Sequence, residues 1–154
     1  RTQTLNIRAY RKDATILDKE SIEKADIVLA DVPCSGLGVI GKKTDIKYRT
    51  DEDKIQELSV LQKRILHNAA SYVKPGGVLI YSTCTITREE NQDNVAWFTE
   101  NYPFVLESLD PYLCEELHSE TTAQGYLQLL PGVHKTDGFF LARLRKKEET
   151  EWNN

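Results

Sequence analysis

Short runs of consecutive apolar residues alternate along the chain with a longer stretch in which apolar residues recur at helical spacing. Ala25–Asp31 is apolar at nearly every position, which is typical of a strand buried on both faces in a parallel sheet covered by helices. Val78–Ser82 is a second run of this kind. Between them, the residues from about Asp51 to Val73 predict a long amphipathic helix, which Pro75–Gly77 ends.

Capping-box patterns mark the expected start of two helices. Thr50 is followed three residues later by Asp53, just ahead of the long amphipathic stretch. Thr87 is followed in the same way by Glu90. This second pattern predicts a shorter helix that runs to about Asn101.

The remaining patterns define the ends of the fold. Leu5–Tyr10 is predicted as a short strand, Gly36–Arg49 as a loop and residues 107–124 as irregular. Gly125–Leu130 and Gly138–Leu144 are apolar-rich runs joined by a loop with Pro and Gly, which predicts an antiparallel pair. The whole order predicts an α/β fold, namely the second half of a Rossmann-like sheet that ends in an antiparallel hairpin.

Composition limits the class of protein. The 154 residues are 40% hydrophobic and carry a net charge of −4, which fits one globular domain. No run of 18 apolar residues predicts a membrane span. Three cysteines without a CxxC pair and three scattered histidines predict neither a disulfide framework nor a metal site, and fit a reducing, cytoplasmic setting. Because the chain begins at Arg1, we expect it to be a segment of a longer protein.

Two cysteines follow predicted strands and are the main candidates for chemistry. Ligands of an open α/β sheet bind outside the carboxyl ends of its strands, so Cys34 and Cys84 are expected to meet in one crevice. Pro33 stiffens the turn before Cys34, and Asp31 ends the strand. Taken alone, Cys34 also fits a small buried apolar residue. The hydroxyl residues around Cys84 form a polar setting that could support a nucleophilic thiolate, whereas Cys114 lacks such surroundings and is expected to be structural.

A glycine motif offers an alternative interpretation. Gly36–Gly41 matches GxGxxG, which in dinucleotide-binding enzymes opens a helix whose N-terminus holds a pyrophosphate. The residues that follow show no helical period. An NAD(P)-binding oxidoreductase is therefore a minor alternative, and the glycines are expected to shape a loop that passes close to a substrate.

The two cysteine segments also carry a family resemblance. Asp31-Val-Pro-Cys34-Ser-Gly and Ser82-Thr-Cys84-Thr resemble the two cysteine motifs of the RNA cytosine-5 methyltransferases, and within them the Sun/Fmu group (ribosomal RNA small subunit methyltransferase B type). Three further stretches agree with that group: Val39–Lys47, Glu89–Asn91 and His134–Ala142. The sequence departs from the family at Gly41, where Arg is common, and at Thr44, where Pro is common.

The resemblance implies a fold, a reaction and a set of site residues. Residues 1–146 would be the C-terminal part of a class I methyltransferase catalytic domain, with sheet strands three to seven, and residues 147–154 a charged, frayed tail. The implied cofactor is S-adenosylmethionine and the implied partner is RNA, in particular small-subunit ribosomal RNA. Cys84 would be the nucleophile that adds to carbon-6 of cytosine, Cys34 would assist release of the product, and Asp31 would bind the base near N3. Asp13, Asp31 and Pro33 would contact the cofactor.

Other function classes remain open at this stage. The acidic balance differs from the basic signature of most nucleic-acid binders. An inert fragment, or an RNA-binding module without catalysis, is therefore the second hypothesis. The family's glycine-rich cofactor loop has no counterpart in this sequence. Local basic clusters do exist, and their members are Arg8, Arg11 and Lys12; Lys42, Lys43, Lys47 and Arg49; and Arg143, Arg145, Lys146 and Lys147.

Overall fold

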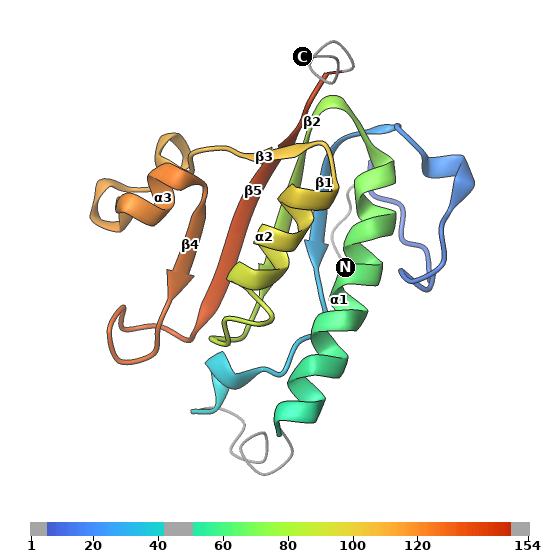
Figure 1. Cartoon of the computed structure of the whole chain (residues 1–154). Coiled ribbons are helices and arrows are strands. Elements are labelled where there is room, and N and C mark those ends of the chain that lie inside the picture. Colours follow the sequence, from blue (N-terminus) through green and yellow to red (C-terminus); the bar gives the residue numbers. More distant parts are fainter. Residues whose placement is uncertain (1–5, 42–50, 149–154) are drawn as a thin grey trace.

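The computed structural model describes residues 6–41 and 51–148, which form one mixed sheet with helices packed against it (Figure 1). The strands are β1 Ala25–Asp31, β2 Val73–Thr83, β3 Phe104–Leu106, β4 Tyr126–Leu129 and β5 Phe139–Lys146. The helices are α1 Glu52–Tyr72, α2 Gln92–Asn101 and α3 Glu120–Gln124, with 3₁₀ turns at Lys19–Ser21, Leu37–Val39, Asp110–Tyr112 and Glu115–Leu117.

The sheet is parallel on one side and antiparallel on the other. Its order is β1-β2-β5-β3, and β4 also pairs with β5. β1 and β2 run parallel, with Asp31 opposite Ser82 at their carboxyl ends. β5 runs antiparallel to β2, β3 and β4, which confirms the predicted terminal hairpin of β4 and β5.

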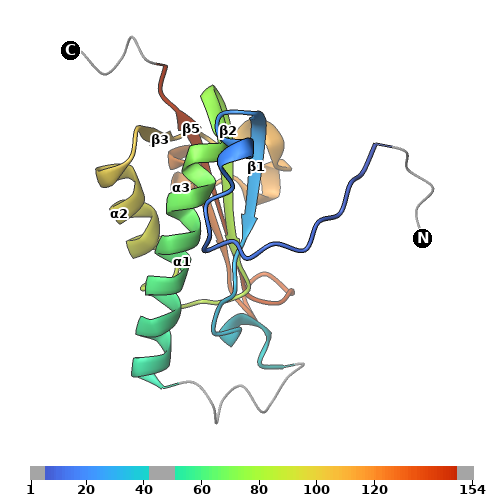
Figure 2. The same cartoon turned by 90° about the vertical axis from the view of Figure 1, so that its right-hand side faces the viewer.

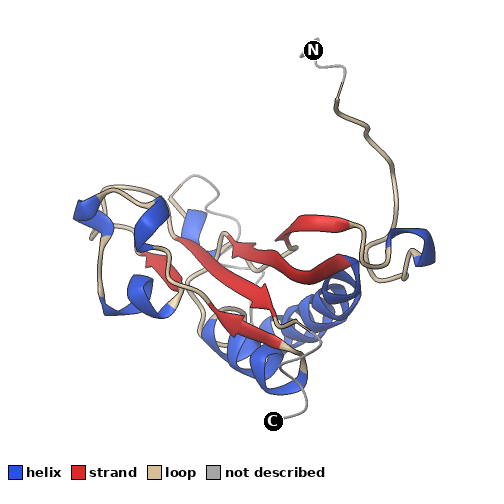
Figure 3. Ribbon diagram, turned by 90° about the horizontal axis from the view of Figure 1, so that it is seen from above, coloured by secondary structure: helices blue, strands red, loops and turns tan. Residues whose placement is uncertain are grey.

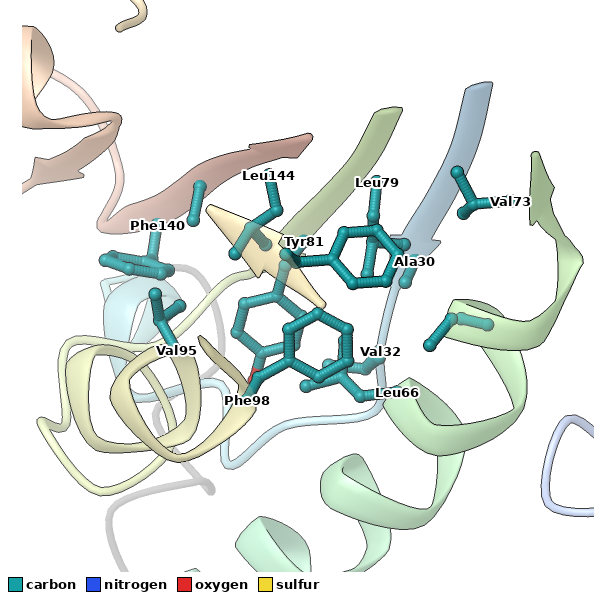
Figure 4. Packing of buried hydrophobic residues seen from close by; sticks show 14 residues of the cluster. Ala30, Val32, Leu66, Val73, Leu79, Tyr81, Val95, Phe98, Phe140 and Leu144 are labelled. Atoms are coloured by element: carbon teal, nitrogen blue, oxygen red, sulfur yellow. The ribbon is translucent and has the colours of Figure 1, made fainter. Parts of the chain in front are cut away.

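Helices α1 and α2 lie together on one face of this sheet (Figures 2 and 3). Between the layers lies an apolar core, in which Tyr81, Phe98 and Phe140 are fully buried (Figure 4). Burying a side chain of this size stabilises the fold by about 1.5–3 kcal/mol. Within the described residues, no helix is long and apolar enough to cross a membrane.

The opposite face of β1 is open. Ile27 and Leu29 are 64% and 66% exposed, whereas Ala30, which points toward the helices, is buried. The prediction that this strand is buried on both faces is therefore wrong for this structure. The physical reason is that both long helices pack on the other face, so that the outer apolar side chains of β1 remain in water.

The long helix confirms its predicted period. α1 ends at Tyr72, one residue before the predicted end, and β2 begins directly after it at Val73. The strand passes through Pro75–Gly77 with a shift in its register against β1, so the apolar run at Val78 is the second part of a longer strand. The cap of α1 is Asp51, whose side chain accepts the backbone N–H of Lys54 at 2.9 Å. The predicted cap Thr50 lies outside the described residues.

The prediction that a helix starts at the second capping-box pattern, Thr87 to Glu90, is wrong. α2 begins at Gln92, five residues after Thr87, and its N-cap Asn91 makes no side-chain capping bond. Thr87 Oγ1 instead donates to Glu90 Oε2 at 2.8 Å, and the Glu90 side chain is fully buried. The carboxyl group does not cap the helix because it is occupied by donors from distant parts of the chain.

Two further segments differ from the predictions. Residues 6–10 form no strand, and Ile7 and Tyr10 are 66% and 70% exposed; Leu5 lies outside the described residues. A strand needs a hydrogen-bonded neighbour, and no described strand pairs with this segment. Residues 107–124, predicted to be irregular, contain α3 and two 3₁₀ turns. The three residues of β3 were missed because so short a run has no measurable period.

The open segment and the central strand should differ in amide exchange. We expect the amides of residues 7–10 to exchange at close to the rate of an unfolded peptide, since they have no partners in the sheet. The amides of Leu79–Tyr81, which pair on both sides, should exchange only on global unfolding. Hydrogen–deuterium exchange read by NMR or mass spectrometry measures both. Equal protection of the two segments would contradict the pairing described above.

Candidate active site

The parallel pairing of β1 and β2 places the two candidate cysteines side by side. Just after Asp31, the backbone N–H of Val32 donates to Ser82 O at 3.2 Å. This bond keeps the segments that follow β1 and β2 close to each other. Cys34 Sγ and Cys84 Sγ then lie 3.1 Å apart, and the backbone N–H of Cys84 donates to Cys34 Sγ at 3.2 Å. The expected convergence of two thiols is present in the structure.

The environment of Cys34 favours its protonated form. Burial, together with the hydrogen bond and the charge of the Cys84 sulfur, raises the pKa of Cys34 from 9.0 to about 12. Cys34 therefore keeps its proton at neutral pH, and its S–H group can donate to Cys84 Sγ. Cys34 is half-buried, and its sulfur contacts a second sulfur as well as its apolar surroundings.

The glycine motif Gly36–Gly41 brings the loop after Cys34 close to the loop that contains Cys84. A Cβ on Gly38 would lie 2.4 Å from Gly138 O and 2.8 Å from Cys84 O, which real side chains do not permit. The backbone N–H of Gly38 donates to Cys84 O at 3.1 Å. Only a 3₁₀ turn, Leu37–Val39, forms within Gly36–Gly41, so the motif does not open the helix that a dinucleotide site requires. Its glycines serve close packing against the Cys84 loop.

A cavity of about 550 Å³ lies beside the cysteine loops, between α1 and the carboxyl end of β1. Its rim includes the three residues proposed for the cofactor: Asp13, Asp31 and Pro33. Leu61, Ile65 and Ala69 of α1 form part of its apolar wall. This combination suits a ligand with an apolar part and with amino, hydroxyl or cationic groups that the two carboxylates can bind.

Both carboxylates of the cavity rim are oriented by hydroxyl groups. Thr15 donates to Asp13 Oδ1 from its backbone N–H at 2.8 Å and from its hydroxyl at 2.7 Å. These bonds, the hydroxyl first, lower the pKa of Asp13, so it is ionised at neutral pH. Ser82 Oγ donates to Asp31 Oδ1 at 2.9 Å. Asp31 thus lies between the cavity and the strand that carries Cys84.

Several members of the basic clusters are paired with carboxylates. Arg143 and Arg145 both pair with Glu107, at 2.6 and 2.8 Å, and Lys146 pairs with Glu23 at 2.9 Å. The cluster Lys42–Arg49 lies outside the described residues. Among the described residues, no group of His, Cys, Asp and Glu side chains could hold a metal ion.

Sequence reasoning missed the buried polar residues that surround the two cysteines. Ser35, Gln62, Thr85 and Glu90 are all buried and joined by hydrogen bonds. The only signal in the sequence was that Glu90 belongs to a stretch shared with the methyltransferase group. Its position three residues after Thr87 suggested a capping function instead.

The sheet and its crevice define a class of protein. A parallel pair with a ligand cavity at its carboxyl edge, followed by an antiparallel terminal strand, is the arrangement of a Rossmann-like methyltransferase domain. The solved structure of PH0851 superposes with a TM-score of 0.77 at 42% identity, over 88% of this chain and 30% of that one. NSun6 from Pyrococcus horikoshii, solved with SFG, superposes with a TM-score of 0.73 at 27% identity, over 94% and 36% of the two chains.

The sequence comparison names the family. The family model described as 16S rRNA methyltransferase RsmB/F matches residues 1–145, and the chain belongs to this family. Ribosomal RNA small subunit methyltransferase F from Cronobacter sakazakii is 35% identical over 147 residues, which are 95% of this chain and 31% of that protein. The chain therefore spans about a third of the length of this curated relative.

The pKa of Cys34 predicts how its thiol reacts. Because burial and the neighbouring sulfur raise its pKa, Cys34 is less ionised at pH 8 than it would be in water. We expect iodoacetamide at pH 8 to modify exposed Cys114 faster than half-buried Cys34, as read by peptide mass mapping.

The control is the Cys84→Ala variant. It removes the neighbouring sulfur but leaves most of the burial, so alkylation of Cys34 should become faster. If Cys34 reacts as fast as Cys114 in the chain without substitutions, the assignment of a retained proton to Cys34 is wrong.

Proposed function

We propose that this chain supplies the reacting thiols of an enzyme that methylates carbon-5 of a cytosine in RNA. The observation that carries the proposal is the contact of 3.1 Å between Cys34 Sγ and Cys84 Sγ at the carboxyl edge of the sheet. Two thiols in contact, of which one retains its proton, match a reaction that needs one nucleophile and one proton-transfer group. Membership in a ribosomal RNA methyltransferase family supports both the reaction class and the substrate class.

Cys84 is the nucleophile in this proposal. Its thiolate forms a bond to carbon-6 of the base, and the electron pair of the carbon-5–carbon-6 double bond moves toward carbon-5 and N3. Carbon-5, unreactive in the aromatic ring, becomes enamine-like. Asp31 ends β1 three residues before Cys34, and its carboxyl group in the protonated form donates a hydrogen bond to N3, where negative charge develops as the sulfur adds.

Cys34 then assists release of the product. Burial raises its pKa, but the hydrogen bond and the charge of Cys84 contribute as well. Both contributions from Cys84 disappear once its sulfur is bound to carbon-6, so Cys34 gives up its proton to water more readily at that stage. Its thiolate can take the carbon-5 proton, and the electron pair left behind expels Cys84 and restores the aromatic ring.

The cavity beside the thiols is the proposed site for S-adenosylmethionine. When bound, this cofactor supplies an electrophilic methyl group. Asp13 and Asp31 offer carboxylates for amino and hydroxyl groups, and Pro33 with the apolar wall of α1 contacts the ring. A relative solved with SFG, an analogue of S-adenosylmethionine, supports this assignment.

The target cytosine has to be outside a helix or flipped out of it, because attack at carbon-6 is perpendicular to the ring. The names of the relatives favour small-subunit ribosomal RNA as the substrate. The reaction requires that both thiols are reduced, which fits a cytoplasmic protein. An RNA-binding module without catalysis is the competing hypothesis, and it assigns no role to the contact between the sulfurs.

Substitution of the two cysteines separates their roles. In an active enzyme that contains this segment, Cys84→Ala should lower methylation by more than about 10⁴-fold, because no covalent adduct forms. Cys34→Ala should instead let the adduct with RNA accumulate as a band of reduced mobility on a denaturing gel. Cys114→Ala, which changes an exposed cysteine, serves as the control. Full turnover by Cys84→Ala would refute the proposal.

Calorimetric titration tests the cofactor site in this chain itself. We expect S-adenosylmethionine to bind weakly or not at all to the 154 residues, and to bind once the chain is extended at its N-terminus. The reason is that the residues lining the cavity contact the ligand from one side only. Asp13→Ala should then weaken binding to the extended chain by about tenfold, as expected for one lost charged hydrogen bond. Unchanged affinity would remove Asp13 from the site.

A further inference from the structure

The strongest unassigned feature is a buried carboxyl group between the two cysteine loops. The Glu90 side chain is fully buried and receives four hydrogen bonds. Two of them come from Ser35, whose backbone N–H donates to Oε1 at 2.9 Å and whose hydroxyl donates to Oε2 at 2.5 Å. The others come from Gln62 Nε2 at 2.8 Å and from Thr87 Oγ1 at 2.8 Å.

These contacts fix the residues directly before and after Cys34. Ser35 directly follows Cys34, and its backbone N–H and hydroxyl are both bound to Glu90. Pro33 directly precedes Cys34, and its carbonyl oxygen accepts Gln62 Nε2 at 2.9 Å. Because Gln62 also donates to Glu90, the peptide on each side of Cys34 is fastened to the same pair of side chains.

The same network reaches the second cysteine. Ser35 Oγ lies 2.7 Å from Thr85 Oγ1, and Thr85 directly follows Cys84. Thr87, two residues further on, donates to Glu90 Oε2, the oxygen that also accepts the Ser35 hydroxyl. The backbone carbonyl of Glu90 accepts Tyr81 Oη at 2.5 Å and Asn94 Nδ2 at 3.2 Å, which ties the carboxyl-bearing residue to the sheet and to α2.

We infer that Glu90 is a positioning residue, which sets the distance between the two thiols because its carboxyl group binds Ser35 of the Cys34 loop and Thr87 of the Cys84 loop. It touches neither the sulfurs nor the cavity and takes no part in the chemistry itself. All four contacts are donated to the two carboxyl oxygens, so an amide side chain, with a single acceptor oxygen, would satisfy fewer of them. The relevance to catalysis rests on the proposed function, but the geometric claim does not.

The test of geometry uses phenylarsine oxide, which bridges two neighbouring thiols. Two As–S bonds form, and the arsenic-bound oxygen leaves as water with both thiol protons, so no oxidant is needed. In the 154-residue chain we expect bridging of Cys34 to Cys84, since the two sulfurs lie 3.1 Å apart, and its rate is the reference for the variants. Glu90→Gln keeps the shape of the side chain but replaces one acceptor by a donor that faces other donors, and it should slow bridging by about tenfold or more.

The matched control is Glu89→Gln, which makes the same change at the exposed neighbouring carboxylate and should bridge at the wild-type rate. Thermal unfolding of each variant shows whether it is folded. If Glu90→Gln does not fold, Ser35→Ala decides the matter, because it removes only the hydroxyl that links Glu90 to Thr85. Bridging at the wild-type rate in folded Glu90→Gln, or in Ser35→Ala, overturns the inference.

A kinetic readout separates positioning from mere stability. In an active enzyme that contains this segment, Glu90→Gln should lower kcat by about 10- to 100-fold at a temperature where the variant is fully folded. The KM for S-adenosylmethionine should stay unchanged, because Glu90 does not line the cavity. A rise in KM with unchanged kcat contradicts the inference. If Glu90→Gln slows bridging but leaves methylation intact, the geometric claim stands and the proposed use of both thiols fails.

Discussion

The parallel pairing of β1 with β2 is the constraint on which the site depends. Because Asp31 lies opposite Ser82, β1 and β2 end at the same edge of the sheet. Cys34 follows three residues after Asp31, and Cys84 follows two residues after Ser82. A register shift of one residue would turn every side chain of β1 to the other face and separate the sulfurs. The cavity depends on the same pairing, since its walls are the end of β1 and the helix packed on it.

The interior changes character along this pair of strands. Around Phe98 and Phe140 it is apolar and joins the sheet to the helices without directional bonds. Beneath the cysteine loops it is polar, with Glu90 at its centre. A buried polar group without partners is costly, so a satisfied network favours one arrangement of the loops over all others. In the described part of the chain, the one buried side-chain oxygen or nitrogen without a partner is Asp110 Oδ1, which is outside this network.

Much of the architecture was predictable from short-range patterns. β1 matches its predicted bounds, and α1 lies within one residue of its predicted ends, because a helix of 21 residues repeats its apolar period many times. The convergence of Cys34 and Cys84 followed from a general property of parallel sheets. The two cysteine motifs were also enough to indicate the methyltransferase family that the sequence comparison then showed.

The sequence by itself thus determined the main elements, the edge at which the thiols meet and the family. Only the tertiary structure decided the open face of β1, the lack of a strand at residues 6–10, the raised pKa of Cys34 and the position of Glu90. Glu90 shows the reason: its local pattern matches a capping box, but its carboxyl group binds Ser35 and Gln62, 55 and 28 residues away. Periodicity depends on neighbours in the chain, whereas burial and hydrogen-bond partners depend on residues that only folding brings together.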